Sequence, residues 1–172
     1  MKYIPLFAIF LFFACNSTST TESKADLATL EKTTTSPFTD TAKLDTFKVS
    51  WQGTVAKGSS ILFKIISYTG QEVYKTSIKA DELLKANENL KKEADKLKFL
   101  KNEVTYFFDE EHFLLPAVLP TEKPDKNVPD KNFYEELKHT RLNGFNYRLG
   151  KEAKVYIAWS TKENKVKVYY KL

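Results

Sequence analysis

The two histidines of the chain, His112 and His139, each lie close to carboxylates in the sequence. His112 ends the run Asp109-Glu110-Glu111-His112, and Glu136 stands three residues before His139, the spacing that di-iron helix bundles use. Neighbouring side chains on a helix point in different directions, and a di-iron site needs its Glu-x-x-His pattern twice. We therefore expect a solvated acidic segment and an ordinary helix here, with no metal ion and no other cofactor.

The serines lack the surroundings that turn a hydroxyl into a nucleophile. None lies in a Gly-x-Ser-x-Gly elbow, and the sequence has neither a phosphate-binding loop nor a dinucleotide fingerprint. We expect a protein that is not an enzyme. The alternative left open is a small hydrolase or metal enzyme whose carboxylates are far apart in the sequence.

Lysines near the end of the chain form the remaining candidate site. Residues 131–172 carry ten basic and four acidic side chains, whereas residues 101–130 carry three basic and seven acidic ones. Strand alternation would place Lys165, Lys167, Tyr169 and Lys171 on one face, which suits an anionic partner. The competing interpretation, which the sequence favours, is that these lysines only solubilise an edge hairpin and prevent aggregation.

Cys15, the single cysteine, follows a pattern typical of an export signal. Lys2 precedes an apolar run, residues 4–14, that is shorter than the roughly 20 residues of a membrane span. The segment Phe12-Phe13-Ala14-Cys15 resembles the lipobox of bacterial lipoproteins, although the two phenylalanines are bulkier than the usual residues. This resemblance implies that residues 1–14 are a cleaved signal peptide and that Cys15 carries a lipid.

The same resemblance implies a place and partners for the protein. A lipoprotein of this kind is anchored in the cell envelope, and Asn16 is not the Asp that retains proteobacterial lipoproteins at the inner membrane, so we expect the outer membrane. The chain is similar to small flavobacterial lipoproteins, and Asp40-Thr41-Ala42 resembles the O-glycosylation acceptor of exported Bacteroidota proteins. Expected partners are the membrane, through the lipid, and an anionic envelope component or envelope protein, but not nucleic acid.

Composition divides the rest of the chain into a linker and one domain. Residues 15–44 are expected to be the lipidated cysteine and a disordered linker, because 13 of the 29 residues from 16 to 44 are Ser or Thr. Residues 45–172 are expected to form a single domain. A hydrophobic content of 42% and an aromatic content of 14% suffice for a core, and without a second cysteine no intrachain disulfide can form.

Apolar periodicity predicts the elements of this domain. Alternation indicates strands over residues 47–51, 61–68, 73–77, 155–159 and 166–170, with a further strand near Tyr147. A stripe at three-to-four spacing predicts one helix from about residue 81 to 104, and Asn132 with Glu135 forms a capping box for a short second helix. Four prolines make residues 114–130 a loop. We predict an α+β fold with a mostly antiparallel sheet of about six strands, in two β blocks that flank a helical segment.

Together these features predict a lipid-anchored envelope protein with a non-catalytic binding or structural-interaction role. An alternative is an accessory or inhibitor-like protein that docks on an envelope partner through the proline-rich loop or the basic hairpin.

Overall fold

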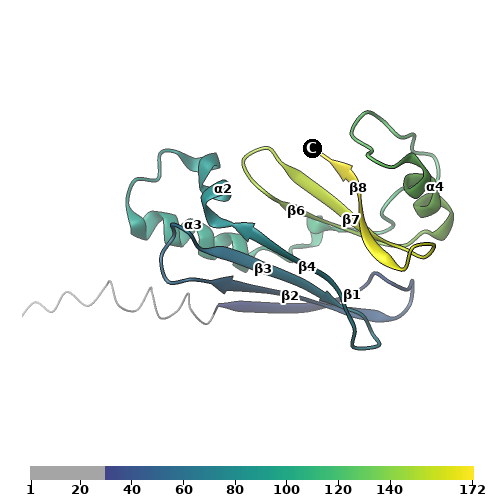
Figure 1. The fold of residues 1–172 in the computed structure, drawn as a ribbon, viewed down its shortest axis with the longest axis horizontal. Helices are drawn as coiled ribbons and strands as arrows, with labels where there is room; N and C mark the ends of the chain where they lie inside the picture. Colours follow the sequence, from purple (N-terminus) through teal and green to yellow (C-terminus); the bar gives the residue numbers. More distant parts are fainter. Residues whose placement is uncertain (1–29) are drawn as a thin grey trace, which may run out of the picture.

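The computed structural model describes residues 30–172, apart from the side chain of Ala86. Cys15, Asn16 and the expected signal peptide lie outside the described residues. Within them the chain forms two antiparallel four-stranded sheets with a few helices (Figure 1). This confirms the α+β prediction, with eight strands instead of about six.

Sheet A is an antiparallel meander in the order β1-β2-β3-β4. Its strands are β1 (Glu31–Pro37), β2 (Leu44–Gln52), β3 (Ser60–Ile66) and β4 (Glu72–Lys79). Alternating apolar residues explain β2 and β3, whose inward side chains Phe47, Val49, Phe63 and Ile65 are fully buried.

Strand β1 lies in the segment for which we expected a disordered linker. It pairs with β2 along its whole length, from Glu31 opposite Ser50 to Pro37 opposite Leu44, and Phe38 directly after it is only 1% exposed. The expected boundary at residue 44 is therefore wrong. Composition did not predict this edge strand, because it has few apolar side chains and is held mainly by backbone hydrogen bonds to β2.

Sheet B has the order β5-β6-β7-β8, and its strands come from the second half of the chain. They are β5 (Phe113–Leu114), β6 (Gly144–Arg148), β7 (Lys154–Ser160) and β8 (Lys165–Lys171). The expected C-terminal hairpin corresponds to β7 and β8. The pairing of β7 with β8 has one irregularity: Ile157 pairs with Val168 and Tyr156 pairs with Tyr170, so that Tyr169 is an extra residue in β8.

The helical middle segment is interrupted where we expected one long helix. Helix α2 (Ala80–Leu84) continues into a 3-10 turn, η1 (Lys85–Asn87), and helix α3 (Glu93–Thr105) follows after a break. Asparagine competes with helical hydrogen bonding, and here the amide of Leu90 donates to the carbonyl of Asn87 in a turn.

Helix α4 (Lys131–Thr140) is close to its expected position, but its cap is not Asn132. The Asp130 side chain accepts a hydrogen bond from the amide of Phe133 and caps the helix instead. A further 3-10 turn, η2 (Glu110–His112), precedes β5.

Aromatic side chains fill the space between the two sheets. Phe63 of sheet A lies 5.2 Å from Phe145 of sheet B between ring centroids, and the hydroxyls of Tyr74 and Tyr147 join the sheets at 2.5 Å. Leu97, Leu100 and Val104 of α3 belong to the same core. Helix α4 packs with Phe133 and Leu137 on a second cluster that includes Ala158 and Tyr169 of sheet B.

Candidate functional site

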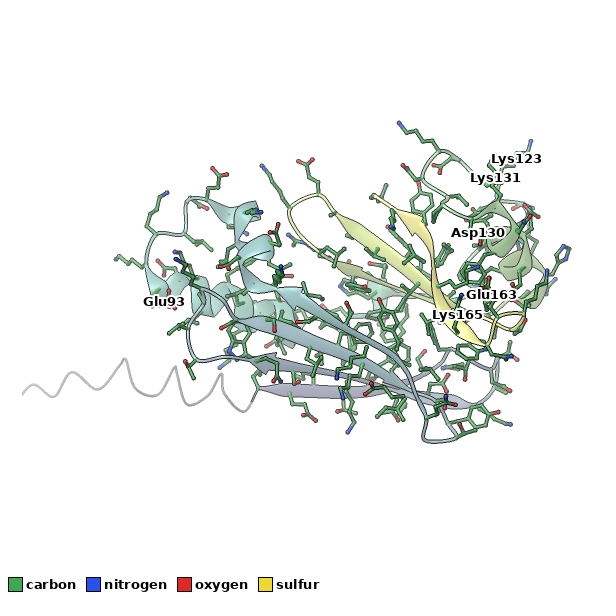
Figure 2. The ribbon with its side chains drawn as sticks, viewed as in Figure 1. Glu93, Lys123, Asp130, Lys131, Glu163 and Lys165 are labelled. Atoms are coloured by element: carbon green, nitrogen blue, oxygen red, sulfur yellow. The ribbon has the colours of Figure 1, made fainter. Side chains whose placement is uncertain are left out.

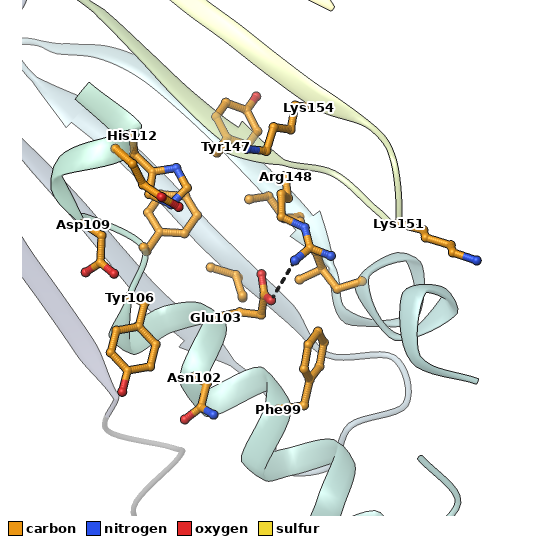
Figure 3. A pocket seen from close by; sticks show the side chains of 15 residues that line it. Phe99, Asn102, Glu103, Tyr106, Asp109, His112, Tyr147, Arg148, Lys151 and Lys154 are labelled. Carbon is orange, nitrogen blue, oxygen red and sulfur yellow. Dashed lines mark hydrogen bonds and ion pairs between the residues drawn. The ribbon is translucent and has the colours of Figure 1, made fainter. Parts of the chain in front are cut away.

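A cavity of about 610 Å³ opens beside α3 and the β6–β7 hairpin (Figure 3). Its apolar lining comes from sheet A and the helical segment, and includes Ile78, Leu83, Phe99 and Phe107. The β6–β7 hairpin adds three cationic side chains, those of Arg148, Lys151 and Lys154. The volume lies within the range of small-molecule sites, which are mostly apolar with a few placed polar groups.

An ion pair lies within this cavity. Arg148 Nη1 is 3.4 Å from Glu103 Oε1, and the Glu103 side chain is 19% exposed. Burial raises the pKa of the Glu103 carboxyl above its ordinary value, although Arg148 and His112 both act to lower it. The desolvation of Glu103 therefore outweighs its favourable contacts.

Two of the three cationic side chains of the cavity have no carboxylate partner among the described residues. Among residues 30–172, neither Lys151 nor Lys154 forms an ion pair, and Lys151 points away from the other labelled side chains in Figure 3. Two acidic residues of the lining, Asp109 and Glu111, are exposed. The cavity thus combines an aromatic and aliphatic wall with two unpaired cations.

His112 contacts one acidic neighbour, with its Nε2 3.9 Å from Glu111 Oε1, but other bonds orient its ring. His112 Nδ1 donates to the carbonyl of Asn146 at 3.0 Å, while Asn146 Nδ2 donates to the Glu111 carbonyl at 3.2 Å. These bonds hold the ring against β6, and the Glu111 side chain is 80% exposed. In the part of the chain that the structure describes, no three His, Cys, Asp or Glu side chains lie close enough to hold a metal ion.

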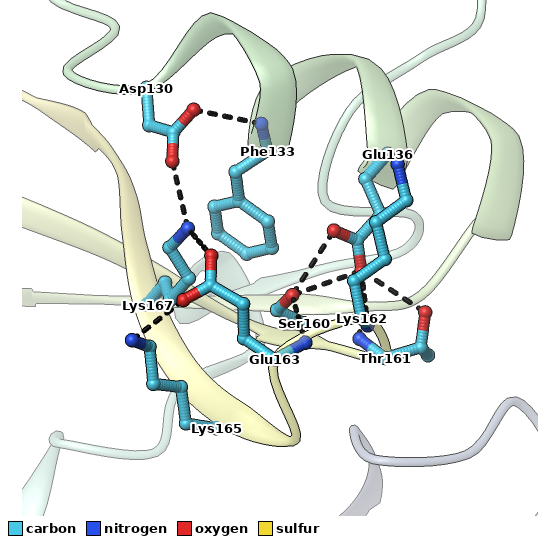
Figure 4. A network of polar contacts seen from close by, with 9 residues as sticks. All are labelled: Asp130, Phe133, Glu136, Ser160, Thr161, Lys162, Glu163, Lys165 and Lys167. Atoms are coloured by element: carbon cyan, nitrogen blue, oxygen red, sulfur yellow. Dashed lines mark hydrogen bonds and ion pairs between the residues drawn. The ribbon is translucent and has the colours of Figure 1, made fainter.

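In the described part of the chain, Glu136 does not pair with His139 but accepts hydrogen bonds from the turn between β7 and β8. Its Oε1 accepts hydrogen bonds from the amide of Thr161 at 2.7 Å, the Thr161 hydroxyl at 3.0 Å and the amide of Lys162 at 3.2 Å, and the Ser160 hydroxyl also donates to it (Figure 4). Helix α4 is thereby fastened to the turn between β7 and β8.

The predicted basic face of β8 is not assembled as expected. Lys167 is held between Asp130, at 2.7 Å, and Glu163, and it lies over the ring of Phe133 (Figure 4). Lys165 pairs with Glu163 at 2.6 Å. Both residues lie near Asp130, at the opposite end of the molecule from Glu93 (Figure 2). Hydrogen bonds from Lys167 and the Phe133 amide lower the pKa of Asp130, and the two carboxylates raise the pKa of Lys167.

Tyr169 does not lie on the surface at all, because it is 3% exposed. Alternation puts Tyr169 on the side of Lys165 and Lys167, but helix α4 covers that side, with the Tyr134 ring 6.5 Å from that of Tyr169. The extra residue in β8 turns Tyr170 the same way. Only Lys165 and Lys171 of the predicted set stay exposed. The prediction of a continuous basic face with Tyr169 among its lysines is therefore wrong.

Sequence reasoning missed the cavity itself. Glu103 follows Phe99 by four residues in α3, so it shares a helix face with an apolar side chain, and Phe107 follows just beyond the end of the helix. A carboxylate on an apolar helix face is a signal that could have drawn attention to it. Nothing in the sequence indicated that Arg148 would meet this residue across 45 positions.

Comparisons with known proteins do not assign the chain to a family. Neither the family models, nor the curated proteins, nor the solved structures gave a match. Within residues 30–172, no helix is both long and apolar enough to cross a membrane. Function is therefore inferred from the arrangement of this chain's own residues.

Proposed function

We propose that this chain is a lipid-anchored, non-catalytic binding protein of the bacterial cell envelope, and that the cavity beside α3 binds a small amphipathic molecule with an anionic group. One observation carries the proposal for the cavity. Three cations of one hairpin, two of them without a carboxylate partner in the described residues, border a wall of apolar and aromatic side chains. An alkyl or ring body would cover this wall, and an anionic head would meet Arg148 and Lys154, with Lys151 at the rim.

Substitution of Arg148 tests most directly whether the cavity binds an anionic group. Decanoate and decyltrimethylammonium have alkyl chains of the same length and opposite charge, and both can be titrated into the mature chain by calorimetry below their micelle concentrations. We expect decanoate to bind and the cation not to bind. Arg148→Gln should weaken decanoate binding by about tenfold, which corresponds to about 1.4 kcal/mol for one charge-assisted hydrogen bond.

Two further variants show whether the loss of binding comes from Arg148 itself. Glu103→Gln releases Arg148 from its carboxylate and should strengthen decanoate binding. Arg141→Gln removes the other arginine of the chain, which is exposed at the end of α4, and should leave the binding unchanged. Equal binding of the two amphiphiles, or an equal loss in the Arg141 and Arg148 variants, would contradict an anion-selective cavity.

The anchor is supported by the sequence around Cys15 and has its own test. Cys15→Ser should abolish incorporation of labelled fatty acid and leave an uncut precursor, because the thiol that receives the lipid is gone. Normal processing and labelling of this variant would refute the anchor and leave the cavity untouched.

A further inference from the structure

The outward face of sheet A has a row of lysines directly opposite one another. Lys48 of β2 pairs with Lys64 of β3, and Lys64 pairs with Lys75 of β4. Their neighbours along each strand are buried in the core, as Phe47, Val49 and Phe63 show, so the lysines point to the other side of the sheet. Lys79 lies four residues after Lys75 in β4, and because side chains alternate along a strand it is on the same face.

This row is costly for the fold, since like charges directly opposite in a sheet destabilise it. Lys64 pairs with Glu72 at 2.8 Å, and the same carboxylate interacts with Lys75 at longer range, but within residues 30–172 neither Lys48 nor Lys75 forms an ion pair. Protection of a sheet edge does not account for them, because Lys48 and Lys64 lie on the two central strands. An anionic ligand on this face would offset the repulsion.

The side chains around the lysines suit phosphate groups at a membrane surface. Hydroxyls surround the row on the outward face, and two apolar side chains lie among them at partial exposure. The hydroxyls are those of Thr33, Thr35, Thr46, Ser50 and Ser77, and the apolar side chains are Leu62 and Ile66. Two carboxylates share the face, Glu31 opposite Ser50 and Glu72 beside Lys64, so the four lysines keep a positive excess of two. Hydroxyls and ammonium groups both donate hydrogen bonds to phosphate oxygens.

Residues 30–37 join this same sheet. The carbonyl of Leu30 accepts a hydrogen bond from the amide of Trp51, and β1 begins at the next residue as the edge strand of sheet A (Figure 1). Cys15 and Leu30 are 15 residues apart in the sequence, a separation that the chain can bridge over at most about 50 Å. A lipid on Cys15 would therefore keep sheet A within a short distance of the bilayer, at a high effective concentration of headgroups.

We propose that the outward face of sheet A docks on the anionic phospholipid headgroups of the bilayer to which the chain is anchored. Lys48, Lys64, Lys75 and Lys79 contact the phosphates, and the cavity beside α3, which opens on the inner side of sheet A, stays accessible. The choice of a membrane as partner rests on the proposed anchor, but the lysine face acts without the lipid.

The experiment uses the mature chain, residues 15–172, with Cys15→Ser, so that no lipid contributes to binding. Flotation with vesicles of phosphatidylcholine containing phosphatidylglycerol is compared with flotation on phosphatidylcholine alone. We expect binding only to the anionic vesicles, and a loss at high salt. The triple variant Lys48→Gln/Lys64→Gln/Lys75→Gln should bind more weakly by on the order of 100-fold.

The control variant Lys162→Gln/Lys165→Gln/Lys171→Gln removes the same charge from the β7–β8 hairpin and should keep most of the binding. Circular dichroism shows whether the sheet A triple variant folds. The single variant Lys75→Glu, at an exposed position, tests the same face without the risk of misfolding and should also weaken vesicle binding. No binding of the unchanged chain to anionic vesicles, binding only to soluble polyphosphate, or equal losses in the two triple variants would overturn the docking face. A failure of Cys15 labelling would instead refute the anchor alone.

Discussion

Glu136 shows how one buried carboxylate can organise a turn between strands. It is 6% exposed, and it collects the donors of Ser160, Thr161 and Lys162 at the start of the β7–β8 turn. Glu136→Ala leaves these donors unmet and should lower the free energy of unfolding by about 2–4 kcal/mol. Glu135→Ala, on the same helix, removes only a surface pair with Lys138 and should cost less than about 0.5 kcal/mol. Urea denaturation of the two variants measures the difference, and equal losses would contradict this role.

Tyr169 and Tyr170 are neighbours with opposite expected effects. The Tyr169 hydroxyl is buried without a hydrogen-bond partner among the described residues, and burial raises its pKa. The Tyr170 hydroxyl donates to Asp125 at 2.9 Å and accepts from Asn127 at 3.1 Å. Tyr169→Phe should therefore raise the free energy of unfolding by about 1 kcal/mol, whereas Tyr170→Phe should lower it by a similar amount. Thermal unfolding of both variants decides, and destabilisation by Tyr169→Phe would show that its hydroxyl has a partner.

At the scale of elements, periodicity predicted the strands that bury one face and failed where backbone pairing dominates. Burial alternates strictly along β2 and β3 and over parts of β7 and β8, and the buried positions of these strands are mostly apolar. Strand β1 has the sequence EKTTTSP, which contains no apolar alternation to detect. The extra residue at Tyr169 has no sequence signal either, because a bulge depends on the register of both strands. The same limit applies to the cavity, whose charged groups meet only through the packing of α3 against β6.

Strand β1 gives a direct test of where the folded domain begins. A chain that starts at residue 30 keeps β1 and the buried Phe38, whereas a chain that starts at residue 45 loses both. The shorter chain also loses two backbone donors to the buried carboxylate of Asp45, which come from Phe38 and Thr39. Removing Phe38 from the core alone should cost about 3–5 kcal/mol, enough to leave the shorter chain largely unfolded. Circular dichroism and proteolysis compare the two chains; equal stability would restore the boundary at residue 44.

At the scale of the whole molecule, the two sheets share one core, and this should make them unfold together. The chain has two tryptophans, Trp51 in β2 of sheet A and Trp159 in β7 of sheet B, and both contact the core between the sheets. Trp159→Phe leaves fluorescence that reports sheet A, and Trp51→Phe leaves fluorescence that reports sheet B. In each variant we expect the fluorescence and far-ultraviolet circular dichroism transitions in urea to coincide, because a domain of this size with one shared core unfolds cooperatively. A fluorescence transition that precedes the dichroism transition in one variant would mean that the sheets separate first. The cavity beside α3, which both sheets line, would then open before the fold is lost, and ligand binding would stabilise that step alone.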